Sequence, residues 1–143
     1  MTVHRTLAWA GLVAYAAVLA GALLSPTSGS QSAAAAHLAT VAQDLGVSPM
    51  RATQERAEFV ANVLLLMPLS ALGSLVWPRS TWRDWAAWSF VLAGLVELTQ
   101  GLLLPERTAT MTDVVANTLG GSLGACVVAA CRWTLRLGPP DPP

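Results

Sequence analysis

Charged and amide side chains interrupt two apolar stretches in the C-terminal half of the chain. Glu97 and Gln100 are three residues apart, and Asp113 and Asn117 are four apart, so each pair projects from one face of a helix. Arg107 lies in the short polar turn between the two stretches. An ionisable residue inside a membrane-spanning helix costs roughly 2.5–3.5 kcal/mol to insert, so it marks a functional site by default. These five residues are the first candidates for ligand binding or acid–base chemistry.

The composition indicates an integral membrane protein. Of 143 residues, 54% are hydrophobic and only 11% are charged, whereas a soluble domain carries about 25% charged residues. The net charge is zero, so we expect no nucleic-acid partner. Cys126 and Cys131 are five residues apart and would face different sides of a helix, which argues against a disulfide or a metal pair. We expect neither a metal nor a cofactor.

Four apolar stretches are long enough to cross a bilayer as helices: residues 7–24, 59–77, 85–104 and 112–131. The first is longer than the apolar core of a signal peptide, about 7–15 residues, so we expect it to be retained. Cleavage within residues 33–36 is the alternative. The predicted fold class is an all-α membrane protein with four transmembrane helices, formed by one domain over residues 1–137. Residues 138–143 are a Pro-rich tail that we expect to be disordered.

A short amphipathic helix is expected between the first two spans, over residues 31–45. Apolar residues recur there at intervals of four, three and four: Ala34, Leu38, Val41 and Leu45. Gly46 follows as a helix stop, and the pattern favours a position on the membrane surface, in the first outer loop. Ser48 and Pro49 then match an N-cap and a first helical position. The next helix is predicted to start there, to run through Trp77 and to bend at Pro68.

The placement of the arginines predicts the orientation. With both termini cytoplasmic, five arginines are inside: Arg5, Arg79, Arg83, Arg132 and Arg136. Three are outside: Arg51, Arg56 and Arg107. This modest bias agrees with the positive-inside rule. The six tryptophans fall near the inner interface in this orientation, as an aromatic belt does. Polar residues deep in the apolar segments then lie in the outward half, and the inner halves are expected to be almost purely apolar.

The ordered polar positions within apolar helices resemble those of the VanZ-like family. The matching segments are RAEFVANVLLLMP at residues 56–68, ELTQ at 97–100 and PERTATMTDVVANTLGG at 105–121. The chain departs from the pattern at Thr110, where some members carry an additional Asp. Members of the family are small bacterial membrane proteins, so the resemblance implies a multi-pass protein of the bacterial plasma membrane. The founding member is linked to low-level teicoplanin resistance, which implies a role in the cell envelope.

Three functions stay open. The resemblance implies a site that engages an envelope lipid, a lipid-linked precursor or a lipophilic glycopeptide. Its core contacts would be Glu97, Arg107, Asp113 and Asn117, supported by Gln100, Asn62, Glu58 and Arg56. The first alternative is a membrane enzyme that modifies an envelope lipid or glycan with Glu97 or Asp113 as general base. No nucleophile triad, metal motif or phosphate loop supports it in the sequence. The second alternative is a structural partner protein whose polar residues only pack helices.

Overall fold

The computed structural model describes residues 3–23, 29–103 and 110–135. In these residues the chain forms five helices: α1 (Val3–Leu23), α2 (Gly29–Asp44), α3 (Gln54–Val76), α4 (Trp82–Leu103) and α5 (Met111–Thr134). No strand occurs in the described part. Four helices, α1, α3, α4 and α5, are long and apolar enough to cross a membrane. The predicted all-α fold with four spans is confirmed.

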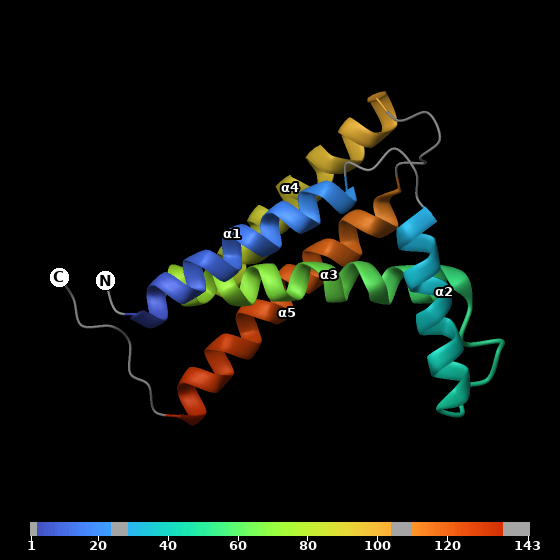
Figure 1. Ribbon diagram of the computed structural model, residues 1–143, viewed down its shortest axis with the longest axis horizontal. Coiled ribbons are helices and arrows are strands. Elements are labelled where there is room, and N and C mark those ends of the chain that lie inside the picture. The colour runs from blue at the N-terminus through green and yellow to red at the C-terminus, as the bar shows by residue number, and fades with distance from the viewer. Residues whose placement is uncertain (1–2, 24–28, 104–109, 136–143) are drawn as a thin grey trace.

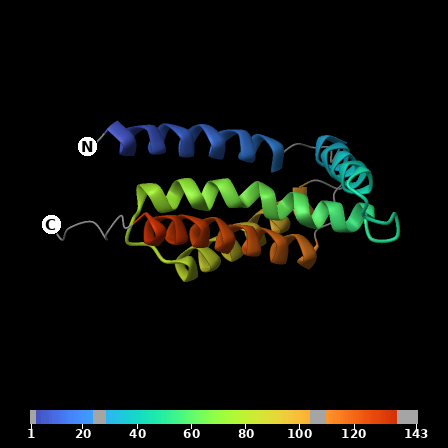
Figure 2. The ribbon, with the colours of Figure 1, turned by 90° about the horizontal axis from the view of Figure 1, so that it is seen from below.

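Helices α3 and α5 form the centre of the bundle. Helix α5 packs against α3 and α4, whereas α1 packs on the opposite side of α3 (Figure 2). The chain alternates in direction, so α1 and α4 start, and α3 and α5 finish, at one end of the bundle (Figure 1). Helix α2 lies across the other end, where it packs on α3 (Figure 1). We call this other end the α2 end.

Glycines allow α5 to approach both of its neighbours closely. A Cβ atom on Gly120 would meet the backbone carbonyl of Val63 on α3, and a Cβ on Gly121 would meet the Ser89 hydroxyl on α4. Gly124 is pressed against α3 in the same way. Small residues at such contacts let helix backbones approach in a membrane, where packing rather than hydrophobicity holds helices together. The packing explains why α5 is the most buried of the four spans.

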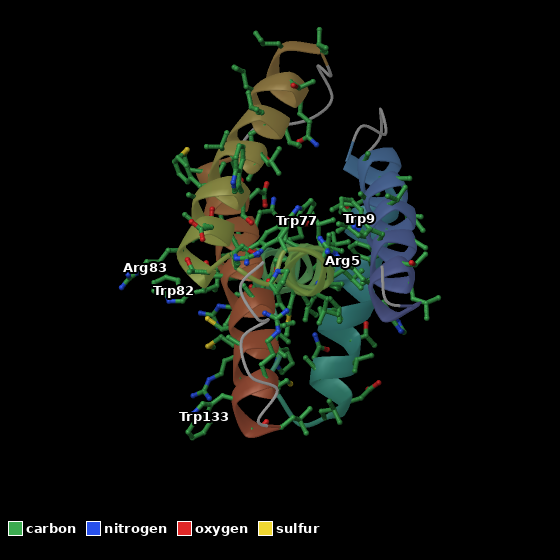
Figure 3. The ribbon with its side chains drawn as sticks, turned by 90° about the vertical axis from the view of Figure 1, so that its left-hand side faces the viewer. Arg5, Trp9, Trp77, Trp82, Arg83 and Trp133 are labelled. Atoms are coloured by element: carbon green, nitrogen blue, oxygen red, sulfur yellow. The ribbon has the colours of Figure 1, made fainter. Side chains whose placement is uncertain are left out.

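Tryptophans gather at the end of the bundle opposite α2, which we call the tryptophan end. The ring centroids of Trp9 and Trp77 are 4.9 Å apart in an edge-on arrangement, and those of Trp77 and Trp85 are 6.3 Å apart. Figure 3 shows Trp9 and Trp77 between helices, with Trp82 and Trp133 on the outer surfaces of α4 and α5. The prediction that these tryptophans share one end is therefore confirmed, while their side of the membrane stays a prediction.

Arg132 of α5 caps the C-terminus of α3 at the tryptophan end. Its Nη2 donates a hydrogen bond to the Ser74 carbonyl oxygen at 2.7 Å, and its Nη1 donates to the Pro78 carbonyl oxygen at 3.3 Å. Carbonyls in the last turn of a helix lack a partner within the helix, and a cation there interacts favourably with the helix dipole. Arg132 thus fastens α3 to α5 at this end.

The predicted start of α3 at Ser48 was wrong. The Arg51 N–H donates to the Ser48 carbonyl at 2.8 Å, but the chain completes only a single turn there. Thr53 then adopts an extended backbone, and its hydroxyl accepts a hydrogen bond from the Arg56 N–H at 3.4 Å. This second N-cap starts α3, which continues through Pro68. Two cap signals lie close together in the sequence, and the later one begins the long helix.

Helix α2 forms where a helix was predicted, but its contact with α3 involves other residues than the predicted apolar stripe. The contact is made by buried alanines: Ala35 and Ala39 of α2 and Ala57 of α3. Leu38 is partly buried against them, whereas Val41 and Leu45 are exposed. Gly46 has a φ of 90°, and its N–H donates to the Gln43 carbonyl, which confirms the predicted helix stop. A position on the membrane surface stays a prediction.

Candidate site at the α2 end of the bundle

Two carboxylates meet at Thr110. This residue is the N-cap of α5, and its hydroxyl accepts a hydrogen bond from the Asp113 N–H at 3.2 Å. The same hydroxyl donates to Asp113 Oδ2 at 2.8 Å. The Thr110 N–H donates to Glu97 Oε2 at 2.7 Å. A single residue therefore holds a carboxylate of α4 and a carboxylate of α5 on either side of itself.

Asn62 connects α3 to the same group. Its Nδ2 donates a hydrogen bond to Asp113 Oδ1 at 2.5 Å. Asp113 therefore bonds through both of its oxygens, one to α3 and one to the cap of its own helix. Because Thr110 also bonds to Glu97, these contacts join α3, α4 and α5 at the α2 end.

Glu97 and two amide side chains on the same two helices are almost fully buried. Glu97 is 9% exposed, Gln100 4% and Asn117 5%. Asn117 lies one helical turn deeper than Asp113 on the same face of α5. We call Asn62, Glu97, Gln100, Thr110, Asp113 and Asn117 the polar cluster. The sequence-based prediction that Glu97 and Gln100 share a face and that Asp113 and Asn117 share another agrees with these positions.

The amide oxygen of Asn117 stands out within the polar cluster. Asn117 Oδ1 is buried and has no hydrogen-bond partner among the residues that the structure describes. Leaving a buried polar atom unpaired costs about 1–3 kcal/mol, so such atoms usually have a partner. A hydrogen-bond donor at this position would remove that cost.

The other predicted site residues are less closely involved. Glu58 is half-buried one turn before Asn62 on α3, and it accepts a hydrogen bond from Gln54 Nε2 at 2.9 Å. Arg56 is exposed, and its Nη1 bonds to the Arg51 carbonyl in the preceding turn. Arg107 lies outside the described residues.

The sequence-based reasoning missed Thr110 and three buried serines. A threonine three residues before an acidic residue at the start of an apolar stretch is an N-cap signal, and it could have identified Thr110. Ser70, Ser74 and Ser89 are buried in the half of the bundle that was expected to be almost purely apolar. The Ser89 hydroxyl lies against Gly121, and the Ser70 hydroxyl lies against Gly124 in the same way. Ser70 and Ser89 therefore occupy space that the glycines of α5 leave free.

The polar cluster contains both hydrogen-bond donors and acceptors. Its two carboxylates accept through both oxygens, and its three side-chain amides both donate and accept. Within the described residues, no group of three or more His, Cys, Asp or Glu side chains is placed to hold a metal ion.

The fold and this cluster together define a multi-pass helical membrane protein with buried carboxylates and amides between three of its spans. The family model described as VanZ/LLP1 matches residues 8–132. The match covers most of the chain, so the chain belongs to the VanZ/LLP1 family, and the resemblance to VanZ-like proteins is confirmed. Neither the curated proteins nor the solved structures gave a match.

Proposed function

We propose that this protein binds the head group of an envelope lipid, a lipid-linked precursor or a lipophilic glycopeptide at the polar cluster. Binding there would lower the susceptibility of the cell to teicoplanin-type drugs. One observation supports this above all: Asn117 carries a buried, unpartnered amide oxygen one turn below Asp113. A cluster that only joined helices would be expected to pair its buried polar atoms internally. Membership of the VanZ/LLP1 family supports a role in the envelope.

We infer that a ligand reaches the site from the α2 end of the bundle. Asp113 is only half-buried, at the first turn of α5, whereas Asn117 lies deeper and is 5% exposed. A ligand that enters at the α2 end would therefore contact Asp113 first and then Asn117. Polar groups at this depth in a membrane protein commonly face a watery cavity or a ligand path.

We infer that the α2 end faces outward from the plasma membrane of a bacterium. Among the described arginines, four belong to the tryptophan end: Arg5, Arg79, Arg83 and Arg132. Two belong to the α2 end: Arg51 and Arg56. The positive-inside rule then favours cytoplasmic termini. In that orientation α2 would rest on the outer membrane surface, with Val41 and Leu45 available to lipid.

Drug susceptibility tests the proposal. A sensitive bacterial host would express wild type, Glu97→Gln or Asp113→Asn at matched membrane levels, and growth inhibition by teicoplanin and vancomycin would be compared. Both substitutions keep the size of the side chain and remove its charge. We expect wild type to protect selectively against the lipid-tailed drug and both variants to lose that protection.

Ser122→Ala is the matched control, because the Ser122 hydroxyl bonds only to the Thr118 carbonyl of its own helix at 2.8 Å. It should protect as wild type does. Full protection by Glu97→Gln and Asp113→Asn would show that the carboxylates have only a structural role, and the proposal would be wrong.

A further inference from the structure

The described charges separate between the two ends of the bundle. Toward the tryptophan end there are four arginines and a single acid, Asp84, which gives a net charge of +3. Toward the α2 end there are two arginines and five acids, which gives −3. These acids are Asp44, Glu55, Glu58, Glu97 and Asp113. Segments 104–109 and 136–143 each contain one arginine and one acid, so they leave this balance unchanged. An anion is therefore favoured at the tryptophan end.

The turn between α3 and α4, at the tryptophan end, is held in shape by its own hydrogen bonds. The N–H and the hydroxyl of Ser80 donate to the Trp77 carbonyl oxygen at 3.0 Å and 2.6 Å, and Trp85 Nε1 donates to the Ser80 hydroxyl at 3.0 Å. Asp84 Oδ2 accepts from the N–H of Thr81 at 2.7 Å and from its hydroxyl at 2.8 Å. The one acid at this end therefore serves as part of the cap of α4.

Two arginines of this turn are available to an external anion. Arg79 lies within the turn and Arg83 is the second residue of α4. Both side chains are exposed, and neither has an ion-pair partner within the described residues. The Arg83 guanidinium lies 5.4 Å from the centroid of the Trp82 ring, and both side chains lie on the outer side of α4 (Figure 3). A guanidinium stacked on a ring keeps the N–H donors at its edge free to bind a phosphate in pairs.

The lengths of the two helices place this turn at the level of lipid head groups. Helix α3 has 23 residues and α4 has 22, so each is about 33 Å long, close to the thickness of about 30 Å of a hydrocarbon core. Only residues 77–81 connect them, so the turn stays near the membrane surface.

We propose that Arg79 and Arg83 bind the phosphate of an anionic phospholipid in the leaflet at the tryptophan end. A zwitterionic lipid brings a cation together with its phosphate, and the positive charge of this end disfavours that cation. The site lies at the opposite end from the polar cluster, and the inference does not depend on the function proposed for that cluster.

Native mass spectrometry of the purified full-length protein in detergent tests this inference. It would measure retention of phosphatidylglycerol and of phosphatidylcholine with the same acyl chains. A basic residue near an anionic membrane surface contributes about fivefold in binding, so we expect wild type to prefer phosphatidylglycerol by about thirtyfold. Arg79→Gln and Arg83→Gln should each lower that preference about fivefold, and the double variant should nearly abolish it. Since both side chains are exposed, thermal unfolding of these variants without added lipid should match wild type.

Two control variants separate a site at the turn from the effect of total charge. Arg51→Gln removes an exposed arginine at the α2 end, and Asp113→Asn alters the polar cluster; both should keep the lipid preference. Equal retention of the two lipids by wild type, or a preference kept by the double variant, would overturn the inference. So would a fall in Arg51→Gln as large as that in Arg79→Gln. Stabilisation against heat by inorganic phosphate, without a preference between the lipids, would assign the arginines to a soluble anion and overturn the lipid assignment.

Discussion

The close approach of α3 and α5 predicts that replacing glycine by alanine affects the stability of the protein differently at two positions. A Cβ atom on Gly120 would meet the backbone carbonyl oxygen of Val63 and the Cβ of Leu66. Backbone atoms cannot turn away as the end of a flexible side chain can, so the two helices must move apart. Gly94 of α4 has no neighbouring atom within 4 Å of the position that its Cβ would take.

Both Gly120→Ala and Gly94→Ala gain the same helix propensity, which is up to about 1 kcal/mol in soluble helices. That gain cancels when the two variants are compared. Overpacking of a close contact costs about 1–3 kcal/mol, and only Gly120→Ala incurs it. We therefore expect Gly120→Ala to be less stable than Gly94→Ala by about 1–3 kcal/mol.

Reversible unfolding in mixed detergent micelles, followed by circular dichroism or by tryptophan fluorescence, measures the difference in free energy of unfolding. Gly94→Ala should equal or exceed wild type in stability. Independent stability changes usually agree within about 0.5 kcal/mol. If the free energies of unfolding of the two variants differ by less than this, the close packing of α5 on α3 would be refuted.

Three further substitutions have defined outcomes in the same unfolding assay. Thr110→Val removes the cap of α5 and the hydroxyl bond to a carboxylate, so we expect a loss of about 0.5–2 kcal/mol. Arg132→Gln removes the guanidinium that caps α3 and should cost about 1.5–3 kcal/mol. Tyr15→Phe removes the bond from the Tyr15 hydroxyl to the Leu65 carbonyl, the described hydrogen bond between α1 and α3, and should cost only about 0.6 kcal/mol.

Matched controls accompany these variants. The Thr118 hydroxyl bonds only to the Val114 carbonyl of its own helix at 2.7 Å, so Thr118→Val should change stability less than Thr110→Val does. If Arg132→Gln has the same free energy of unfolding as wild type, the capping of α3 by Arg132 would be contradicted. Tyr15→Phe should lose less stability than Arg132→Gln. If both lose the same free energy of unfolding, the Tyr15 hydroxyl contributes more than a single hydrogen bond between α1 and α3 does.

Much of the fold could be predicted from local sequence. Long apolar stretches indicated the four spans, and Gly46 marked the end of α2 because only a residue tolerant of positive φ suits that position. The start of α3 could not be fixed in this way, since both Ser48 and Thr53 are good caps. The two caps are equivalent by residue type, so local sequence does not decide which of them begins the long helix.

The polar cluster was predictable only in part. Helical spacing placed Asp113 and Asn117 on one face, but spacing within a helix does not say which side chain of another helix lies opposite. The bond from Asn62 to Asp113, across 51 positions in the sequence, depends on how α3 crosses α5. The role of Thr110 depends likewise on its position between α4 and α5. The buried serines were missed because small polar residues in an apolar helix leave little trace in hydrophobic periodicity.

The central claim is that the polar cluster serves a ligand and does not only hold helices together. The most direct measurement determines, in the same cells, the amount of folded protein in the membrane and the protection against teicoplanin. We predict that Asp113→Asn reaches the wild-type folded amount and loses protection, whereas Gly120→Ala loses protection only in proportion to its folded amount. If Asp113→Asn protects as well as wild type per folded molecule, the polar cluster is structural and the claim is contradicted.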